Sequence, residues 1–270
     1  MKIIYGLTTY NRKGYLENHI KTWYDTIDKK QEWTLYINDD GSDDGSKEYI
    51  ENLSFGDVNI VKNFAKRRGV HYGINKILQY SEKEEFDFGF KAEDDIFFKK
   101  DGWENIYISA SKKTGYKHLA FVDRKWAEKY TTAILLKTPI QNKKKSIEAK
   151  ISNAYNAYGC FWTFTPDIIK KVGYIDVENF GLSGNGHTDY TLRCCNLGYN
   201  NRKPFYDAID SELYIEMIRD DYHCAATGRV RNFASTFGVK HGHKGRVLED
   251  KNRKYIPYKE LEYNVFGEEI

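Results

Sequence analysis

The chain has 270 residues, enough for one large domain or for one domain with an extension. Its hydrophobic content of 40%, charged content of 30% and net charge of +3 are typical of a soluble globular protein and give no argument for nucleic-acid binding. The sequence shows no apolar leader and no run of about 18 apolar residues, so we expect a cytoplasmic protein with no signal peptide or transmembrane helix, with peripheral membrane contact left open. The four cysteines (Cys160, Cys194, Cys195 and Cys224) lack C-x-x-C spacing, and we expect free thiols in a reducing compartment.

The first hundred residues alternate between strand and helix patterns. Residues 2–9 form a nearly continuous apolar run, and residues 15–27 carry apolar side chains at a helical period. We predict strands over 2–9, 33–39, 58–62 and 86–92, and helices over 15–27, 46–53 and 70–81. Strand–helix repeats at this spacing predict a mostly parallel sheet covered by helices on both faces.

The pattern loosens after residue 100. We predict helices over 103–113, 166–173 and 188–198, and strands over 118–123 and 158–165. The Lys-rich segment 135–150 is predicted to be a mobile loop, either a solvated charge run or a contact for an anionic ligand. Residues 206–270 are polar, rich in Tyr, Arg and His, and give no clear pattern.

Three polar clusters follow predicted strands, at residues 8–12, 38–46 and 93–95. Each of them, taken singly, could be an ordinary polar loop. Because the carboxyl ends of parallel strands meet at one edge of a sheet, and ligands bind beyond that edge, the three clusters together predict a binding site.

The segment EDD, residues 93–95, places three carboxylates between apolar neighbours. Oxygen ligands of this kind suit Mg²⁺ or Mn²⁺, which often bind through one or two carboxylates while substrate phosphates complete the shell. Alternation along an extended chain predicts Glu93 and Asp95 on one side and Asp94 on the other. We expect Asp95 to be the chief ligand and Glu93 to be second or to act through water, with a plain acidic turn as the alternative.

The segment DDGSDDGS, residues 39–46, does not fit a calcium loop. An EF-hand that began at Asp39 would need a Glu twelve residues on, where the chain has Ile50. A better role is polar capture, in which Asp39 accepts hydrogen bonds from a base or ribose and Gly41 permits close backbone approach.

Two histidine-containing segments are further candidates. His241 and His243 alternate, so on an extended chain both imidazoles could reach one ion, or both could be ordinary surface residues. His187 and Asp189 lie at the start of a predicted helix, where either could be a general base. A capping role is the alternative for Asp189.

The order of these motifs resembles the family 2 type of nucleotide-sugar glycosyltransferase. The matching segments are GLTTYNR, INDDGSDDGSKEYI, KRRGVHYGINKIL, FKAEDDIFF and HTDYTLRCCNLGY, which span residues 2 to about 200. The resemblance implies the α/β GT-A fold, which is Rossmann-like, with a mostly parallel central sheet flanked by helices in a single large domain. It also implies a nucleotide-sugar-binding half over 1–100, an acceptor half over 101–205, and a C-terminal extension over 206–270 that packs on the same domain.

The resemblance further assigns roles to single residues. Thr8, Tyr10 and Arg12 would line the nucleotide pocket, with Asp39 on the base, Asp40 on the nucleoside, Arg68 near the nucleotide or its phosphates, and Asp94 among the donor-binding residues. Asp95, with Glu93, would hold Mn²⁺ or Mg²⁺ against the diphosphate, and His241 or His243 would complete the metal shell.

Two positions depart from the family pattern. Glu93 replaces the usual first Asp but keeps an oxygen ligand. The E-D pair that commonly precedes the helix acid is replaced by Gly186 and His187, so that His187, Asp189 or a residue elsewhere would be the base.

The implied reaction is a metal-dependent displacement at the anomeric carbon that moves a sugar from a nucleotide-diphosphate sugar, with UDP favoured, to a hydroxyl acceptor such as a glycan. A single displacement inverts the configuration, while a retaining outcome stays open because the fold hosts both. The alternatives are a non-catalytic glycan- or nucleotide-binding module on a degenerate scaffold, and a sugar nucleotidyltransferase. The second would need a Gly-rich phosphate loop after the first strand, and the segment TTYNRKG is poor in Gly.

Overall fold

The computed structural model describes residues 1–123, 146–151, 159–202, 205–218, 250–260, 262–264 and 268–269. In chain order the elements are β1 (Lys2–Thr9), α1 (Lys13–Thr26), β2 (Glu32–Asp39), α2 (Ser46–Asn52), β3 (Val58–Phe64), α3 (Val70–Lys83), β4 (Phe88–Glu93), β5 (Ile96–Phe98), α4 (Trp103–Thr114), β6 (Ile147–Ile151), β7 (Phe161–Phe164), α6 (Pro166–Val172), α7 (Val177–Phe180), α8 (Gly186–Asn196), β8 (Phe205–Ala208), a 3-10 helix η1 (Ser211–Leu213) and β9 (Ile215–Met217). All the elements predicted in the first hundred residues are present, with ends within two residues of the expected positions.

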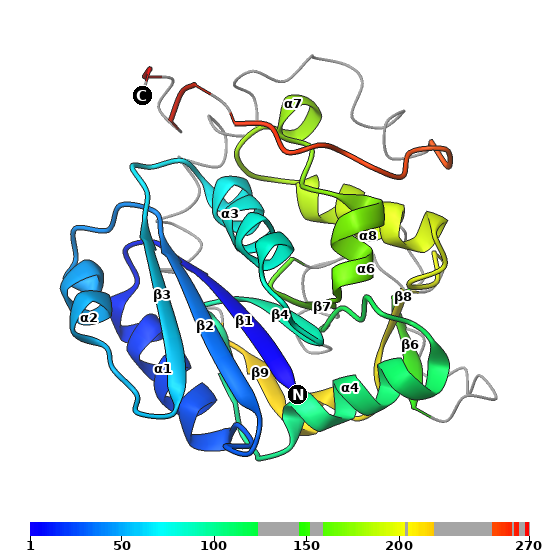
Figure 1. The fold of residues 1–270 in the computed structure, drawn as a ribbon, viewed down its shortest axis with the longest axis horizontal. Coiled ribbons are helices and arrows are strands. Elements are labelled where there is room, and N and C mark those ends of the chain that lie inside the picture. Colours follow the sequence, from blue (N-terminus) through cyan, green and yellow to red (C-terminus); the bar gives the residue numbers. More distant parts are fainter. Residues whose placement is uncertain are drawn as a thin grey trace.

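The central sheet has five strands in the order β3-β2-β1-β4-β7 (Figure 1). The first four are parallel, and β7 runs antiparallel to β4. This arrangement confirms the predicted mostly parallel sheet. Two small antiparallel pairs, β5–β9 and β6–β8, lie beside it.

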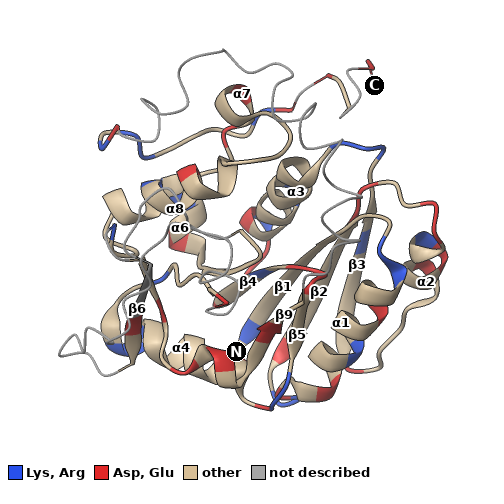
Figure 2. Ribbon diagram, turned by 180° about the vertical axis from the view of Figure 1, so that it is seen from behind, with Lys and Arg blue, Asp and Glu red and all other residues tan. Residues whose placement is uncertain are grey.

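Helices cover both faces of the sheet because alternate strand residues point to opposite sides. On β1, Ile3 and Tyr5 belong to an apolar cluster with α1 and α4, whereas Ile4 belongs to a second cluster with α3, α6 and α8. Gly6 lets α3 approach closely, since a Cβ there would lie 2.3 Å from Ile77 Cγ2. The view from behind brings α1 in front of the sheet (Figure 2).

Charged residues of both signs are interspersed on the outer helices. On α1 and α2 the pairs Lys21–Asp25 and Lys47–Glu51 are spaced i, i+4, and blue and red residues lie side by side there in Figure 2. This mixing agrees with the small net charge of the chain.

Two predictions for the second half differ from the structure. Residues 118–123 were predicted as a strand, but only Ala120 forms a bridge, to Trp162. The segment is buried and runs beside β7, yet its backbone bonds alternate between β7 and residues 199–206, as in His118 N to Tyr199 O, so no regular ladder forms. The end of the predicted Lys-rich loop belongs to β6, and its residues 135–145 lie outside the described part of the chain.

The C-terminal extension contributes to the core. The predicted boundary at residue 205 falls on the first residue of β8, and β9 pairs with β5, the strand that follows residues 93–95. Residues 250–260 pass beside α7 on the side of the molecule that carries α3, α6 and α8 (Figure 1). Ile256 anchors them through backbone bonds with Val172 and Tyr174.

Three of the four cysteines lie in the described residues, and all three are free thiols, as predicted. Burial raises the pKa of Cys195 to about 12 and that of Cys194 well above its usual value. Cys224 lies outside the described part. None of the helices described is long and apolar enough to cross a bilayer.

Candidate active site at the carboxyl ends of the parallel strands

The three predicted polar clusters meet at one edge of the central sheet. In the strand register Thr8 lies opposite Glu93 on one side and Asn38 on the other, and Thr9 lies opposite Asp39. The loops after β1, β2 and β4 therefore leave the sheet together, as the sequence predicts.

The first two loops are joined by reciprocal hydrogen bonds. Asn11 donates from Nδ2 to Asp43 Oδ1 at 2.7 Å and accepts from the Asp43 backbone N–H at 2.8 Å. Its own backbone N–H donates to Ser42 Oγ at 2.8 Å, and that of Lys13 donates to Asp44 Oδ2 at 2.8 Å. Asn11 has φ 46°, a left-handed conformation that Asn tolerates better than most residues.

Asp39 and Asp40, predicted to contact the nucleoside, also shape the loops. Asp39 accepts from the Ser42 hydroxyl at 2.5 Å. Asp40 accepts from the backbone N–H groups of Arg68 at 2.6 Å and Gly69 at 2.9 Å, and from Arg67 Nη1 at 3.2 Å. Burial raises the pKa of Asp40 to about 6 against these favourable contacts. Asp40 thus fixes the segment between β3 and α3, a role that we did not predict.

Thr8 and Tyr10 occupy different layers of the site. The guanidinium carbon of Arg67 lies 3.3 Å from the centre of the Tyr10 ring, so the two side chains are stacked. Thr8 is buried and packs closely against α3. A Cβ added to Gly73 of α3 would lie only 3.0 Å from Thr8 Cγ2. The Thr8 hydroxyl donates to Ala92 O at 3.5 Å, so Thr8 supports the site from below.

Arg12 is the partner of the acidic segment on the β1 side. Its Nη2 lies 2.6 Å from Asp94 Oδ1, its Nη1 lies 4.0 Å from Asp95 Oδ2, and Thr9 donates to Asp94 Oδ2 at 2.6 Å. Both aspartates are fully buried. Burial raises the pKa of Asp94 to about 7, the nearby Arg12 lowers it, and the neighbouring Asp95 raises it.

The predicted alternation of the three carboxylates is wrong. It assumes a strand that continues through Asp95, whereas β4 ends at Glu93 and the next two residues form a turn. Asp94 and Asp95 therefore both approach Arg12. Glu93 points elsewhere and pairs with Lys91, whose Nζ lies 2.8 Å from Glu93 Oε1.

His187 packs against Gly159, in the segment before β7. A Cβ at Gly159 would be 2.8 Å from His187 Cγ, and Gly159 O accepts from Lys91 Nζ at 2.7 Å. His187 is half-buried. Of the two predicted bases, His187 is therefore the one that borders the Glu93 side of the site.

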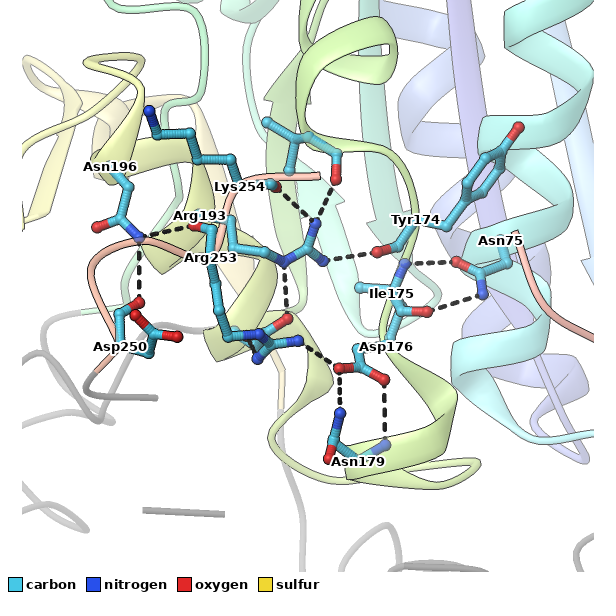
Figure 3. A network of polar contacts seen from close by, with 12 residues as sticks. Asn75, Tyr174, Ile175, Asp176, Asn179, Arg193, Asn196, Asp250, Arg253 and Lys254 are labelled. Carbon is cyan, nitrogen blue, oxygen red and sulfur yellow. Dashed lines mark hydrogen bonds and ion pairs between the residues drawn. The ribbon is translucent and has the colours of Figure 1, made fainter. Parts of the chain in front are cut away.

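Asp189 pairs with two arginines, Arg193 and Arg253, which Figure 3 shows within a network of polar contacts. Arg193 Nε lies 2.8 Å from its Oδ2 and Arg253 Nη1 lies 2.5 Å from its Oδ1, while Arg253 also pairs with Asp176. The whole residue is 1% exposed, and burial raises its pKa against the two guanidinium groups. Both of its oxygens are therefore engaged in a buried ion-pair network, and its role as the base stays a prediction.

Arg68, predicted to lie near the donor phosphates, contacts the C-terminal segment. Its Nη1 lies 3.3 Å from Glu260 Oε1, and Glu260 Oε2 lies 3.6 Å from Lys76 Nζ. Tyr72 lies beneath both cations, 4.6 Å from the Arg68 guanidinium and 5.1 Å from Lys76 Nζ. A carboxylate of the chain itself thus accompanies the predicted phosphate-binding arginine.

The donor set of the acidic segment suits a hard divalent cation that takes its remaining ligands from substrate. Within the described part of the chain, the three carboxylates of Glu93, Asp94 and Asp95 contact two cations, Lys91 and Arg12, and carboxylate oxygens are ligands that such a cation prefers. Within the described ranges no group of three or more His, Cys, Asp or Glu is placed to hold a metal ion by itself. His241 and His243, the predicted further ligands, lie outside those ranges.

Sequence reasoning missed Thr9, Arg67, Lys91 and His71. The signal for Lys91 was present, because it is the one charged residue within the apolar strand FGFKA, and a charge in a buried strand needs a partner. Successive side chains of a strand point to opposite faces, so Thr8 and Thr9 cannot both point toward the acidic turn. It is Thr9 that bonds Asp94.

His71 links the start of α3 to the loop between α7 and α8. Its Nδ1 lies 2.7 Å from Gly181 O, and its backbone N–H donates to Leu182 O at 3.1 Å. Because it is fully buried, its pKa falls to about 4. The start of α3 is thereby held against the loop that leads to α8.

We expect His71 to make stability depend on pH. The unfolded state binds a proton near pH 6.5, and the folded state does so only near pH 4, so stability falls as pH drops through this window. The loss is on the order of 3 kcal/mol. Denaturant unfolding at pH 7, 5.5 and 4.5 should show that His71→Asn, which keeps a donor near the Nδ1 position, lacks this part of the pH dependence. Asp40 titrates in the opposite sense, but its contribution is the same in the wild type and in His71→Asn and cancels in the comparison. If the stability of both proteins depended equally on pH, the assignment to His71 would be contradicted.

Comparison with known proteins gives one family model and several relatives. The model described as glycosyl transferase family 2 matches residues 6–173. An uncharacterized glycosyltransferase of Acanthamoeba polyphaga mimivirus is 24% identical over 222 residues, which is 80% of this chain and 81% of the relative.

Solved structures share the fold at low identity. The S. aureus protein TarS in complex with UDP is 16% identical, with a TM-score of 0.52 over 77% of this chain. The mannosyltransferase PcManGT from Pyrobaculum calidifontis, in complex with GDP-Man and Mn²⁺, is 14% identical, with a TM-score of 0.58 over 85% of this chain. This chain spans 60% of the length of each. The likeness establishes a GT-A fold, as predicted.

Proposed function

The chain belongs to glycosyl transferase family 2, and from this premise we propose that it transfers a sugar from a nucleotide-diphosphate sugar to a hydroxyl acceptor, with a glycan as the acceptor class. The observation that carries the proposal is the meeting of the β1, β2 and β4 loops at one edge of the sheet, where Arg12 approaches Asp94 and Asp95 and Asp40 holds the start of α3. A UDP-sugar is our first choice of donor. The solved neighbours bind UDP in one case and GDP-Man in the other, so both belong in a donor screen.

We assign donor binding to the loops after β1 and β2 and to the start of α3. Tyr10 stacked on Arg67, together with Asp39, would face the nucleoside, and Arg68 would face the diphosphate. The cation would be held by Asp95. When bound, it would neutralise charge that builds on the departing nucleoside diphosphate.

We assign the general base to His187. The imidazole would accept the proton of the acceptor hydroxyl while that oxygen attacks the anomeric carbon on the face opposite the leaving diphosphate. A single displacement of this kind inverts the configuration. Its position against Gly159, whose carbonyl accepts from Lys91, supports this role, and general-base catalysis contributes about 10²–10⁴-fold.

A donor screen tests the proposal. Purified protein with Mn²⁺ is expected to release nucleoside diphosphate from at least one UDP- or GDP-sugar, and EDTA is expected to stop the release. Release of pyrophosphate from a nucleoside triphosphate and a sugar phosphate would identify a nucleotidyltransferase instead. If nucleotides bind but no donor is consumed with varied acceptors, the chain is a binding module.

Glu260 gives a further prediction. Because it pairs with Arg68 and Lys76, a donor diphosphate would have to compete with it for the same cations. Its side chain is 45% exposed, so the pair is worth no more than about 1 kcal/mol. Calorimetry with UDP and GDP should show that Glu260→Gln binds nucleotide up to about fivefold more tightly than the wild type.

Two variants control this measurement. Glu178→Gln removes an equivalent carboxylate that pairs with Lys259 of the same C-terminal segment and should leave affinity unchanged. In an Arg68→Gln background the gain from Glu260→Gln should shrink. A gain of the same size there would mean that Glu260 does not act through Arg68.

A further inference from the structure

Lys91 is a buried cation in the middle of the central sheet. It lies on β4, opposite Gly6 of β1 and Trp162 of β7, and is 0% exposed. Burying an ammonium group is costly unless it is paired and hydrogen-bonded. The contacts of the Lys91 ammonium group therefore indicate its role in the site.

The ammonium group has two partners on different elements. One is Glu93 Oε1, at 2.8 Å, and the other is the backbone carbonyl of Gly159, at 2.7 Å. The backbone N–H of Glu93 also donates to Cys160 O at 2.8 Å. The end of β4 is thus fastened to the segment before β7, against which His187 rests.

Among the described residues, the three acidic side chains contact two cations from opposite sides. Arg12 approaches Asp94 and Asp95 from the β1 side, and Lys91 holds Glu93 on the β7 side. If Glu93 turned toward a cation bound at Asp95, the buried ammonium would lose its carboxylate, which is strongly unfavourable.

We propose that Lys91 is a positioning residue: its ammonium group, fixed by the Gly159 carbonyl, holds the Glu93 carboxylate away from the divalent cation, so that Asp95 is the residue of this acidic segment that binds the cation. The inference rests on the proposed metal-dependent donor binding and narrows it, because it removes Glu93 from the metal shell. It also gives Glu93 a different task. With Lys91, Glu93 keeps the acidic turn in register with the segment that borders His187.

Direct measurement of Mn²⁺ binding tests this inference without relying on activity. Free Mn²⁺ is quantified by electron paramagnetic resonance, with and without UDP or GDP. Asp95→Asn is expected to weaken Mn²⁺ binding more than tenfold, whereas Glu93→Gln is expected to change it less than about twofold. Lys91→Met is expected to tighten Mn²⁺ binding about tenfold, because it leaves a nearby carboxylate uncompensated.

The double variant Lys91→Met/Glu93→Gln separates positioning from structural support. Removing both partners of a buried pair costs less stability than removing one, so this variant keeps the test valid if Lys91→Met alone fails to fold. Its Mn²⁺ affinity should return to that of Glu93→Gln. Lys62→Met is the matched control, because Lys62 on β3 donates to the carbonyls of Glu51 and Leu53 and is expected to leave Mn²⁺ affinity unchanged.

Three results would overturn the inference. If Glu93→Gln weakens Mn²⁺ binding as much as Asp95→Asn does, Glu93 is a ligand and Lys91 is only a counter-charge. If the double variant stays tenfold tighter than Glu93→Gln, Lys91 does not act through Glu93. If the wild type binds no Mn²⁺ with either nucleotide, the proposed metal dependence fails as well, so failure of the inference alone is distinguishable from failure of the function.

Discussion

Replacing Asp95 with asparagine is expected to lower the kcat/KM of the proposed sugar transfer by about 10³-fold or more while leaving the protein at least as stable as the wild type. The loss of activity follows from the loss of the cation ligand. The stability follows from the electrostatics of the turn, where, among the described contacts, Asp94 and Asp95 both approach the guanidinium of Arg12 and Asp95 raises the pKa of its neighbour. An amide at position 95 removes that repulsion. Thermal unfolding and steady-state kinetics of the same preparation measure both effects.

Asp94→Asn is the matched control, with the same change of carboxylate to amide at the adjacent residue. Asp94 accepts from Thr9 and pairs closely with Arg12, so its loss leaves a largely buried guanidinium without its nearest partner and should lower the melting temperature. The two variants should therefore shift stability in opposite directions. Equal destabilisation by both, or an Asp95→Asn protein with more than a tenth of wild-type activity, would contradict the assignment.

The sheet was predictable because burial leaves a direct mark on sequence. β1 is apolar on both faces and reads as a continuous run, and α3 carries Ile74, Ile77 and Leu78 at a helical period against it. The same signal misleads at 118–123, where Leu119 and Phe121 are buried without belonging to a strand. Periodicity reports which side chains are buried, and it does not report whether the backbone finds a regular partner.

The place of the site was predictable, and the pairing within it was not. Parallel strands oblige the loops after β1, β2 and β4 to leave from one edge, whatever their contacts. Which cation meets which carboxylate depends on residues far apart in the chain, such as Arg253 and Asp189, 64 positions apart, and Arg68 and Glu260, 192 apart. The turn at Asp94 likewise depends on Arg12, so the alternation rule had no means of finding it.

The choice of base shows what the distant partners change. From sequence, His187 and Asp189 are equivalent candidates at the start of one helix. Arg193 and Arg253 form ion pairs with the two carboxylate oxygens of Asp189. His187, in contrast, packs against Gly159, whose carbonyl accepts a hydrogen bond from Lys91. The same ion-pair network ties residues 250–260 to α8, which is why we assign the base to His187 and a positioning role to Asp189.

We expect the two residues to fail in different ways when replaced. His187→Ala should lower kcat by about 10²–10⁴-fold with an unchanged melting temperature, and it should remove the acidic limb of the pH–rate profile. Asp189→Asn should destabilise the protein by about 3–5 kcal/mol, because it leaves the buried Arg193 without its carboxylate. Activity per folded molecule of Asp189→Asn should stay within about tenfold of the wild type, as expected for a residue that does not transfer the proton.

Asp167→Asn controls for the loss of an aspartate from the first turn of a helix. Asp167 pairs with Lys117 and Lys171 at the start of α6, accepts from the Tyr199 hydroxyl and is 34% exposed, so its replacement should cost about 1–2 kcal/mol, less than that of the buried Asp189. If Asp189→Asn proves as mild as this control yet inactive, the carboxylate reaches the acceptor and Asp189 is the base after all. If His187→Ala keeps full activity while Asp189→Asn is only destabilised, another group accepts the proton of the acceptor hydroxyl. The residues at the start of α8 would then have a structural role only.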